Sequence, residues 1–424
     1  MPKRSHSGSA PAQRIDDVAC PFCPLLCDDL VIEKRGDELA ARKHACARAV
    51  SAFARPRPAG TALINGERAN HTAAIGAAVK ILKAAQAPLI SGLGTDVDGA
   101  RAAVALAERA RAMLDHANTA GLDSGMRVLQ SRGWYTTTLA EVRNRADLII
   151  LVGADVVTNY ANFMRRVVEP RQTLHNDRRE HRRVVHIGPQ ASAPAATPSC
   201  AVETIRTRPA DLAATMSQLR AALGGHALAR GTRTRRIAAL AAAIRQAAYP
   251  VFVWAPGQLP RGDADVTIAT TARLIDDLNR HQRAAGLVLG GDNGAIGAVN
   301  VCAWLTGFPL HVSFAGKTLE YDPVRYRTER LLGDRAIDTL VWIDAFGDAP
   351  MPALDDAVKC IAIGDPAAAA NTRANVFIPV GTPGVDHAGR LVRTDSVITL
   401  HVDQLRPRGF RSAADVLQEL LAQW

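Results

Sequence analysis

Short apolar runs alternate with alanine-rich segments of helical spacing through most of the chain beyond residue 60. The runs are typical of strands buried on both faces, and a glycine or proline ends most of them. They lie at Pro88–Gly94, Asp147–Asp155, Val184–Pro189, Pro250–Gly257, Gly286–Gly291, Ile337–Ala345, Lys359–Gly364 and Asn375–Val380. Helices are predicted between them, at 72–86, 98–115, 210–223, 232–248, 265–282 and 412–424. This alternation predicts parallel sheets in α/β layers, and the strands are too many for one sheet.

Composition and charge narrow the class of protein. With 48% hydrophobic and 22% charged residues the chain is ordinary for a globular protein, and no apolar stretch is long enough to span a bilayer. The net charge is +10, but only Arg178–Arg183 and Arg230–Arg236 form basic runs, and no aromatic residues interleave with them. A nucleic-acid-binding surface is therefore not predicted. The polar N-terminus has no secretory apolar region, so we expect a cytoplasmic protein.

Four of the seven cysteines fall within the first 46 residues, at Cys20, Cys23, Cys27 and Cys46. In a reducing compartment, clustered thiols more often bind metal than form disulfides. Three thiolates on one loop with a remote fourth suit a [4Fe–4S] cluster. Zinc remains an alternative, with His44 beside Cys46, and so does a set of structural thiols that binds nothing.

Other motifs identify no catalytic residue. The turns at Gly92–Gly94, Gly153 and Gly290–Gly297 could approach a phosphate, but none extends to a full dinucleotide-binding fingerprint. The chain has no P-loop, no HExxH and no G-x-S-x-G. The remaining cysteines, Cys200, Cys302 and Cys360, are expected in the core.

Several segments, in the same order along the chain, resemble the molybdopterin oxidoreductases and, within them, the B subunit of formylmethanofuran dehydrogenase. The cysteine loop stands before two Rossmann-like regions, as in that family. Arg132–Arg166, and most specifically Glu141–Asp147 (EVRNRAD), resembles the stretch that leads into a pterin-site strand. Gly291–Gly307 resembles the segment that approaches the second pterin guanine dinucleotide, and Gly389–Leu400 resembles the closing segment.

The resemblance implies a molybdopterin-oxidoreductase-like α/β fold. This fold would have two Rossmann-like parallel-sheet domains, a small N-terminal cysteine-loop module and no C-terminal β-barrel. We expect a disordered arm at 1–17, the iron–sulfur-type module at 18–60, a first Rossmann-like domain from 61–115 with 250–424, and a second from 116–249. The resemblance assigns the cluster ligands to the four N-terminal cysteines. It places ancestral pterin-site positions at Gly153, Asp155, Gly290, Gly291, Asn293 and Gly294.

Departures from the family pattern bear on function. In the redox relatives a cysteine or selenocysteine ligates tungsten or molybdenum about a dozen residues before the glycine that matches Gly133, but this chain has no cysteine between Cys46 and Cys200. Arg48 follows the fourth cluster cysteine where the relatives commonly carry a lysine. The turn Asp155–Asn159 lacks the expected Asn/Asp-Pro. We therefore expect that molybdopterin guanine dinucleotide and its metal have been lost.

This pattern resembles the B subunit of the bacterial formyltransferase/hydrolase complex. It implies a non-redox, non-catalytic scaffold in one-carbon metabolism, in a complex that moves a formyl group from formyl-tetrahydromethanopterin through a methanofuran-type carrier to formate. The partners would be the transferase, hydrolase and other subunits, with no nucleic acid and no membrane. One alternative is a true dehydrogenase subunit whose tungsten or molybdenum is held by Asp123 or Ser124. Another is an unrelated α/β binding protein.

Overall fold

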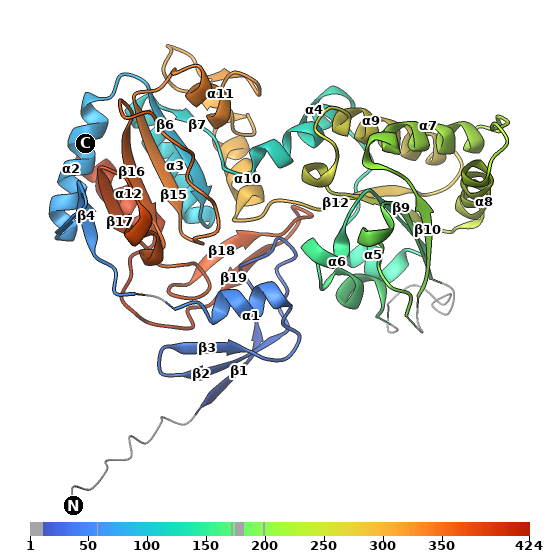
Figure 1. Cartoon of the computed structure of the whole chain (residues 1–424), viewed down its shortest axis with the longest axis horizontal. Helices are drawn as coiled ribbons and strands as arrows, with labels where there is room; N and C mark the ends of the chain where they lie inside the picture. Colours follow the sequence, from blue (N-terminus) through green and yellow to red (C-terminus); the bar gives the residue numbers. More distant parts are fainter. Residues whose placement is uncertain (1–11, 57, 171–172, 174–181, 198–199) are drawn as a thin grey trace, which may run out of the picture. The chain divides into compact units, whose positions relative to one another are not determined.

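The computed structural model describes residues 12–56, 58–170, 173, 182–197 and 200–424 (Figure 1). The chain divides into two compact units, unit 1 with residues 1–118 and 292–424, and unit 2 with residues 119–291. Residues 1–11 of the predicted arm and 178–181 of the first basic run lie outside the described residues. No helix in the described part is long and apolar enough to cross a membrane.

The sheet of unit 1 has the strand order β14-β13-β7-β6-β15-β16-β17-β4-β5. Its central strands run parallel: β7 (Met113–Leu114), β6 (Pro88–Gly94), β15 (Thr339–Asp344), β16 (Lys359–Gly364) and β17 (Val376–Pro379). Short antiparallel strands close the two edges: β13 (Val312–Ser313), β14 (Glu320–Tyr321), β4 (Ala62–Ile64) and β5 (Glu67–Ala69). Since β6 precedes β7 in the chain, the parallel centre is doubly wound, and its order reverses between β6 and β15.

Helices cover this sheet with their apolar faces. One layer consists of α2 (His71–Ala84), α12 (Ala413–Ala422) and α3 (Val97–Ala110), which contact β17, β16 and β6 respectively (Figure 1). The helix α10 (Ala295–Thr306) packs on α3 and β6, and α11 (Thr328–Gly333) precedes β15. The central strands carry fully buried Leu, Ile and Val, as expected for strands covered on both faces.

The N-terminal module of unit 1 is a three-stranded antiparallel sheet with one helix. Its elements are β1 (Gln13–Val18), β2 (Leu30–Arg35), β3 (Glu38–Ala41) and α1 (Ala47–Phe53), with the cysteine loop between β1 and β2. Residues 13–17, expected in the disordered arm, form β1 because they pair with β2 in the register Ile15↔Ile32. A separate hairpin consists of β18 (Gly389–Val392) and β19 (Thr399–Val402).

Unit 2 is a second doubly wound domain. Its parallel sheet has the order β10 (Ala201–Arg206), β9 (Arg183–Gly188), β8 (Leu148–Val152), β11 (Pro250–Trp254) and β12 (Ala285–Val288). Its helices are α4 (Asp123–Arg132), α5 (Leu139–Arg145), α6 (Val156–Asn159), α7 (Leu212–Leu223), α8 (Thr232–Gln246) and α9 (Ala264–Leu278). The order reverses between β8 and β11, as in a Rossmann fold. The prediction of two Rossmann-like parallel-sheet regions is confirmed.

The boundary between the two regions differs from the expected one. Residues 250–291 were assigned to the first domain, but β11 pairs with β8 from Pro250↔Leu148 to Val253↔Leu151 and β12 pairs with β11. These strands complete the sheet of unit 2, which therefore ends at Gly291 rather than at residue 249. At its other end, unit 2 begins at Thr119 rather than at residue 116.

Candidate functional site

Each doubly wound sheet has one natural ligand-binding position, the crevice at the carboxyl ends of the strands where the strand order reverses. There, free backbone N–H groups and helix N-termini can bind the phosphates of a dinucleotide. These positions lie between β6 and β15 in unit 1 and between β8 and β11 in unit 2.

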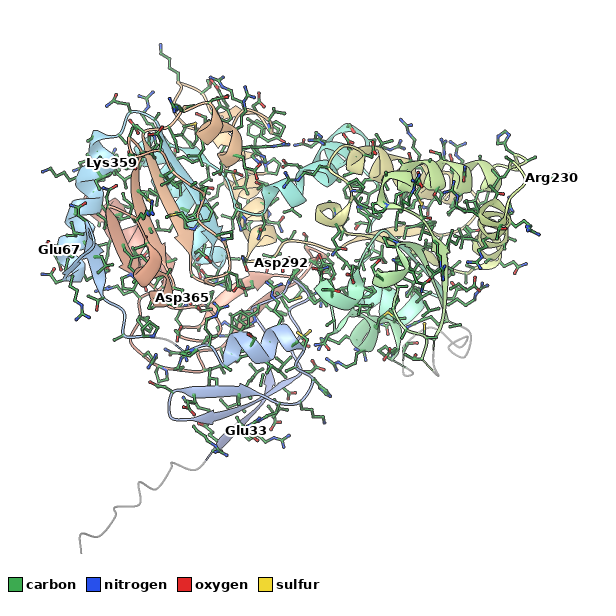
Figure 2. All side chains as sticks on the ribbon, in the orientation of Figure 1. Glu33, Glu67, Arg230, Asp292, Lys359 and Asp365 are labelled. Atoms are coloured by element: carbon green, nitrogen blue, oxygen red, sulfur yellow. The ribbon has the colours of Figure 1, made fainter. Side chains whose placement is uncertain are left out.

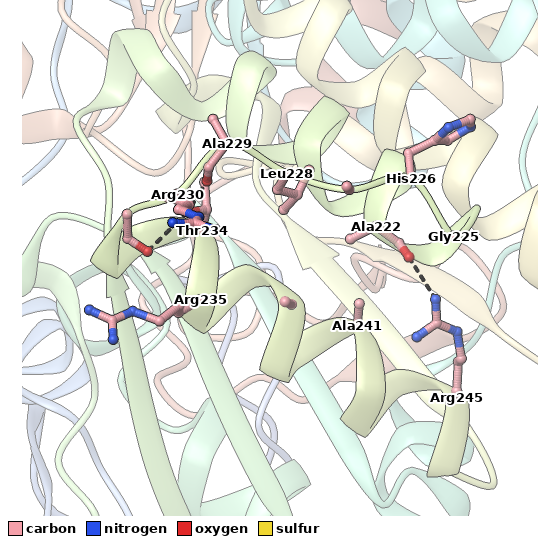
Figure 3. A pocket seen from close by; sticks show the side chains of 13 residues that line it. Ala222, Gly225, His226, Leu228, Ala229, Arg230, Thr234, Arg235, Ala241 and Arg245 are labelled. Atoms are coloured by element: carbon pink, nitrogen blue, oxygen red, sulfur yellow. Dashed lines mark hydrogen bonds between the residues drawn. The ribbon is translucent and has the colours of Figure 1, made fainter.

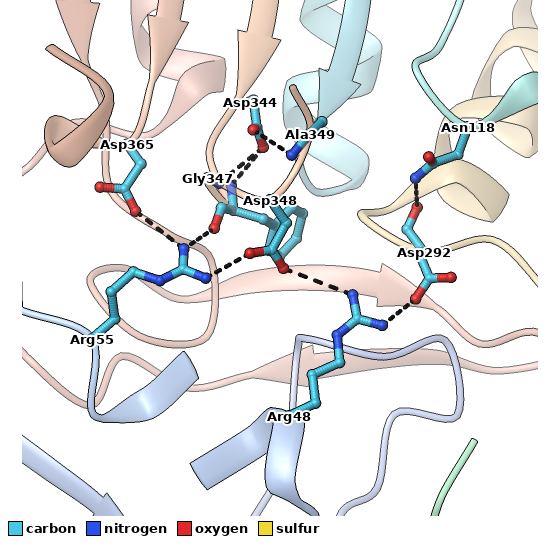
Figure 4. Close-up of polar contacts among 10 residues, drawn as sticks. Arg48, Arg55, Asn118, Asp292, Asp344, Gly347, Asp348, Ala349 and Asp365 are labelled. Carbon is cyan, nitrogen blue, oxygen red and sulfur yellow. Dashed lines mark hydrogen bonds and ion pairs between the residues drawn. The ribbon is translucent and has the colours of Figure 1, made fainter. Parts of the chain in front are cut away.

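In unit 1 this position is filled by Asp344, the last residue of β15. Its carboxylate accepts hydrogen bonds from the N–H groups of Phe346, Gly347 and Ala349, at 3.2, 3.0 and 2.9 Å (Figure 4). A Cβ on Gly94 of β6 would lie 2.8 Å from Oδ1 of Asp344. Burial raises the pKa of this carboxyl group to about 6. The chain's own carboxylate thus takes the N–H donors that a phosphate would need.

Two neighbouring strand ends of unit 1 repeat this arrangement. Asp96, after β6, accepts from Gly99 N–H at 3.0 Å and caps α3, and burial raises its pKa. Asp365, after β16, accepts from Ala367 N–H at 2.9 Å. Both side chains are buried. This edge of the sheet is therefore rich in carboxylates, which disfavours a second anion.

In unit 2, Asp155 caps the short helix α6 and accepts from the N–H groups of Val157 and Thr158 at 3.1 and 2.9 Å. The N–H of Asp155 itself donates to Oε1 of Gln258 at 2.7 Å, which joins the loops after β8 and β11. On β9, a Cβ on Gly188 would lie 2.8 Å from Cε1 of His186, so the imidazole occupies the space beside this glycine. The strand-order reversal of unit 2 is thus also occupied by side chains of the chain.

Two of the predicted pterin-site positions require glycine because of the fold itself. Gly294, at φ +76°, begins α10, and a Cβ there would lie 2.0 Å from the carbonyl oxygen of Thr95. At Gly153, where φ is +65°, an added Cβ would lie 2.7 Å from Cδ1 of Leu212. Backbone conformation and packing require glycine at both positions, whether or not a cofactor binds.

The remaining predicted positions fall on both sides of the unit boundary. Gly290 and Gly291 end unit 2, whereas Asn293 belongs to unit 1. Asn293 is buried at φ +55°, and its Oδ1 has no hydrogen-bond partner among the described residues. It is therefore the predicted position that still offers an unused buried polar atom.

The cysteine loop is tightly folded. Cys20 N–H donates to the carbonyl of Cys27 at 2.7 Å, and Leu26 N–H donates to the carbonyl of Cys23 at 3.0 Å. Backbone N–H groups of Phe22 and Leu25 point at the sulfurs of Cys20 and Cys23. Burial raises the pKa of the Cys23 thiol to about 12 and that of Cys20 further, so both are protonated at neutral pH in the structure described.

The donor set of this loop consists of four thiols close enough for Cys23, Cys27 and Cys46 to act electrostatically on Cys20. No group of three His, Cys, Asp or Glu side chains in the described residues lies close enough together to hold one metal ion. A cubane cluster is larger than an ion, so its thiolates stand further apart, and N–H···S bonds stabilise its charge. The four thiols and the two N–H groups therefore fit the chemistry of a [4Fe–4S] site.

Two arginines of the N-terminal module bind the acidic edge of the unit 1 sheet (Figure 4). Arg48 donates to Asp292 at 2.5 Å and lies 3.7 Å from Asp348. Arg55 binds Asp348 at 2.5 Å and donates to the carbonyl of Phe346 at 2.7 Å. The partners of Arg48 are therefore carboxylates of the chain itself.

His116 is buried with both ring nitrogens engaged. Nδ1 accepts from Asn118 N–H at 2.9 Å, and Nε2 lies 3.2 Å from the carbonyl of Asn293. Burial lowers the pKa of His116 to about 4, and it does the same for His186, whose Nδ1 has no partner among the described residues. Both imidazoles are therefore neutral at pH 7.

Lowering the pH from 7 to 5 should destabilise the chain through these two histidines. On acidification the unfolded chain binds protons near pH 6.5 and the folded chain only near pH 4, so stability falls across this window, by about 2 kcal/mol per group. His186→Leu should remove one such contribution. The measurement is chemical unfolding at both pH values, and an unchanged pH dependence in the variant would contradict the assignment.

Arginine side chains line three hollows away from the strand-order reversals, of about 630, 520 and 560 Å³. The first, of about 630 Å³, lies between the end of α7 and α8 (Figure 3), where Arg245 donates to the carbonyl of Ala222 at 2.6 Å. The second, of about 520 Å³, lies beside the N-terminal module, where Arg408 pairs with Asp37 and Arg42 with Glu33. None of the predicted site residues lines any of the three hollows.

Of the aspartates at the strand ends only Asp155 was predicted from the sequence, although a signal for the others was present. An aspartate stands at or just after the ends of β6, β7, β8, β15 and β16, as Asp96, Asp115, Asp155, Asp344 and Asp365. A strand followed by aspartate, rather than by a complete glycine fingerprint, is the pattern of a capped and closed edge. Asp292 and Asp365 lie at this edge of unit 1 in Figure 2.

The α/β architecture of the two doubly wound units agrees with the molybdopterin-oxidoreductase-like fold expected from the sequence. Acetylene hydratase from Pelobacter acetylenicus has this fold in common with the chain, with a TM-score of 0.62 at 9% identity, over 96% of this chain and 69% of that one. No family model matches the chain.

More specific similarities lie within this class. The chain is 27% identical to the B subunit of tungsten-containing formylmethanofuran dehydrogenase 2 of Methanocaldococcus jannaschii, over 90% of this chain and 92% of the relative. It is 29% identical to the B subunit of the formyltransferase/hydrolase complex Fhc of Methylorubrum extorquens, over 78% and 87%. The crystal structure of the FhcABCD complex of that organism with methylofuran contains a similar chain, with a TM-score of 0.74 at 26% identity, over 85% and 98%. The resemblance to these B subunits is confirmed, and the alternative of an unrelated α/β binding protein is wrong.

Proposed function

We propose that this chain is a non-redox scaffold subunit of a formyltransferase/hydrolase complex. The complex moves a formyl group from formyl-tetrahydromethanopterin through a methanofuran-type carrier to formate. The chain's own role is to assemble with the transferase, hydrolase and other subunits and to line the path of the carrier. Its similarity to the B subunit of Fhc and to a chain of the FhcABCD complex supports this proposal.

The observation that carries the proposal is the occupation of both strand-order reversals by the chain's own side chains. Asp344 in unit 1 and Asp155 in unit 2 take the N–H donors that a pyrophosphate would need. The chain also has no cysteine between Cys46 and Cys200 to ligate tungsten or molybdenum. These features do not fit a bound pterin guanine dinucleotide.

The cysteine loop differs from the strand-end positions, because its four thiols fit a cofactor, the [4Fe–4S] cluster. We infer that Cys20, Cys23, Cys27 and Cys46 would hold a [4Fe–4S] cluster, which supplies one-electron transfer when bound. In a scaffold with no redox metal to serve, this site is inherited and no electron transfer through it is needed for formate release. Seven free cysteines are consistent with the reducing cytoplasm that the sequence predicts.

One alternative keeps support from the structure. Asp123 and Ser124, the substitutes considered for a lost cysteine ligand, are both buried in the first turn of α4. A tungsten dehydrogenase with an oxygen ligand would use such a position, and a relative of that name is 27% identical. Tungsten or molybdenum bound with a pterin would favour this alternative.

The scaffold proposal predicts that electron transfer is dispensable. When the chain is co-expressed with the transferase and hydrolase subunits, Cys23→Ser should leave formate release within about twofold of wild type. Phe22→Ala, in the same loop, is the comparison variant that should fail. Phe22 is fully buried, and its ring centroid lies 5.0 Å from that of Phe53. Loss of this ring should impair folding of the module and its assembly into the complex. Failure of the wild-type chain to co-purify, or loss of formate release in Cys23→Ser, would count against the scaffold.

A further inference from the structure

The second basic run of the sequence, Arg230–Arg236, lies beside the hollow of about 630 Å³ between the end of α7 and α8 (Figure 3). We call it the α7–α8 hollow. Between Asp211 and Asp263 the chain carries seven arginines and no aspartate or glutamate. The positive charge of this stretch is therefore not neutralised by carboxylates of the stretch itself.

The lining of the α7–α8 hollow combines cationic and apolar side chains. Its arginines are Arg230, Arg235 and Arg245, its apolar residues are Leu228 and five alanines, and no carboxylate lines it among the described residues. Figure 3 shows Arg230 and Arg235 at one end of the hollow and Arg245 at the other. Low-dielectric walls that carry one sign of charge concentrate the electrostatic potential inside such a hollow.

Two carboxylates stand on neighbouring segments, and each binds an arginine outside the α7–α8 hollow. Asp211 binds Arg208 at 2.8 Å, and Asp277 binds Arg220 at 2.7 Å. Asp277 and Arg220 line the adjoining hollow of about 560 Å³ and not this one. Arg245 lines both hollows, and its guanidinium donates to the last carbonyl groups of α7.

Arg230 and Arg235 are the arginines of the α7–α8 hollow whose charge is not matched. Their side chains form no hydrogen bond or ion pair with the residues that the structure describes. The other arginines of the basic run are engaged elsewhere, since Arg233 lies 3.9 Å from a carboxylate and Arg236 donates to the carbonyl of Thr204 at 3.0 Å. The unmatched charge of this run is therefore directed to the hollow.

Hydrogen bonds fix the loop that forms one wall of the α7–α8 hollow. His226 N–H donates to the carbonyl of Ala221 at 3.0 Å, and Oγ1 of Thr234 donates to the carbonyl of Ala229 at 2.6 Å. Ala241, on the opposite wall, is buried. A site that is already formed before a ligand arrives loses less free energy to ordering when the ligand binds.

A phosphate monoester matches the α7–α8 hollow in charge and in size. It carries about −1.5 to −2 charges near neutral pH, which two unmatched arginines can neutralise, and the guanidinium fork fits phosphate geometry. The N-terminus of α8, where Gly231 provides no side-chain cap, adds to the positive potential. The volume is typical of small-molecule sites, about 300–1,000 Å³, and the apolar lining favours an organic group over a bare anion.

We propose that the α7–α8 hollow binds a small organic phosphate. The phosphate group lies at the end lined by Arg230 and Arg235, and the organic group packs against Leu228 and the alanines of the lining. The site is separate from the strand ends of unit 2, because Asp155 and the other residues there do not line this hollow.

The first test titrates the full chain with three small probes and measures Kd by calorimetry. Phenyl phosphate has a ring and a phosphate group, inorganic phosphate lacks the ring, and benzoate keeps the ring with a single negative charge. Phenyl phosphate should bind at least about fivefold more tightly than either of the other two. Equal Kd values for phenyl phosphate and inorganic phosphate would overturn the organic group, and equal Kd values for phenyl phosphate and benzoate would overturn the choice of phosphate.

The second test compares exposed residues of α8 that line the α7–α8 hollow with neighbours that do not. Arg235→Gln should raise the Kd of phenyl phosphate at least about fivefold, whereas Arg233→Gln, which removes the same charge outside the hollow, should change it less than about twofold. Ala238→Leu should block the organic group and raise Kd by a similar factor, whereas Ala239→Leu should not.

The remaining outcomes decide against the site or against a small ligand. Failure of phenyl phosphate to bind, or equal Kd values in the wild-type chain and all four variants, would overturn the site and leave the scaffold proposal unaffected. A hexaglutamate peptide that binds more tightly than phenyl phosphate, and loses that affinity in Arg235→Gln, would overturn the small ligand in favour of an acidic polypeptide.

Discussion

Replacement of Gly294 by alanine is expected to destabilise the chain by about 3 kcal/mol or more. The added Cβ would lie 2.0 Å from the carbonyl oxygen of Thr95, a buried residue whose backbone cannot move aside cheaply. The overpacking costs about 1–3 kcal/mol, and the positive φ of +76° adds about 1–2 kcal/mol. Chemical unfolding of the purified chain measures the loss.

Gly36→Ala is the control for the backbone term alone. Gly36 also has a positive φ, +58°, but no atom lies within 4 Å of the position of its Cβ. We expect a loss of only about 1 kcal/mol there. If Gly294→Ala were no worse than Gly36→Ala, the glycine would not be required by packing, and its assignment to cofactor approach would regain support.

Asp344→Ala is expected to destabilise the chain by about 2–3 kcal/mol and to create an anion-binding position. Three N–H groups, of Phe346, Gly347 and Ala349, lose the buried carboxylate that accepts their hydrogen bonds. Burial of the carboxylate is itself unfavourable and raises its pKa to about 6, so removal of the side chain offsets part of this loss. Because the freed N–H groups point into the β6–β15 crevice, inorganic phosphate should raise the melting temperature of the variant.

The wild-type chain should show no such response to phosphate, since Asp344 already takes these donors. Asp334→Ala is the matched control, because Asp334 is exposed and pairs with Arg330 on the same helix turn. Its stability should be within about 0.5 kcal/mol of wild type. A variant at Asp344 as stable as wild type, or a wild-type chain stabilised equally by phosphate, would show that the carboxylate does not close the crevice.

The buried strands were the part of the fold that local sequence could predict. Pro88–Gly94 and Lys359–Gly364 form β6 and β16 with the predicted bounds, because both faces of these strands are covered and their residues are apolar or glycine except for Ser91 and Lys359. The helix α10 was missed since its residues are apolar on all sides and show no helical period. The strand β10 was missed because it is an edge strand, largely exposed.

Contacts between segments far apart in the chain could not be predicted from the sequence. The assignment of β11 and β12 to unit 2 depends on their pairing with β8, about a hundred residues earlier, and no local pattern encodes it. The same holds for the ion pair of Arg48 with Asp292, which are 244 positions apart. The predicted site positions follow β8 and β12 in the chain, but the closure of the strand ends by Asp344 and Asp155 depends on where their carboxylates point.

The central claim is that this chain supports formyl transfer and hydrolysis without a pterin-bound metal. The most direct measurement is tungsten, molybdenum and pterin content, together with formate release, on the anaerobically purified complex that contains this chain. The account predicts less than about 0.1 tungsten or molybdenum per chain, no pterin, and full formate release. About one tungsten or molybdenum per chain with bound pterin, together with reduction of an electron acceptor, would contradict it.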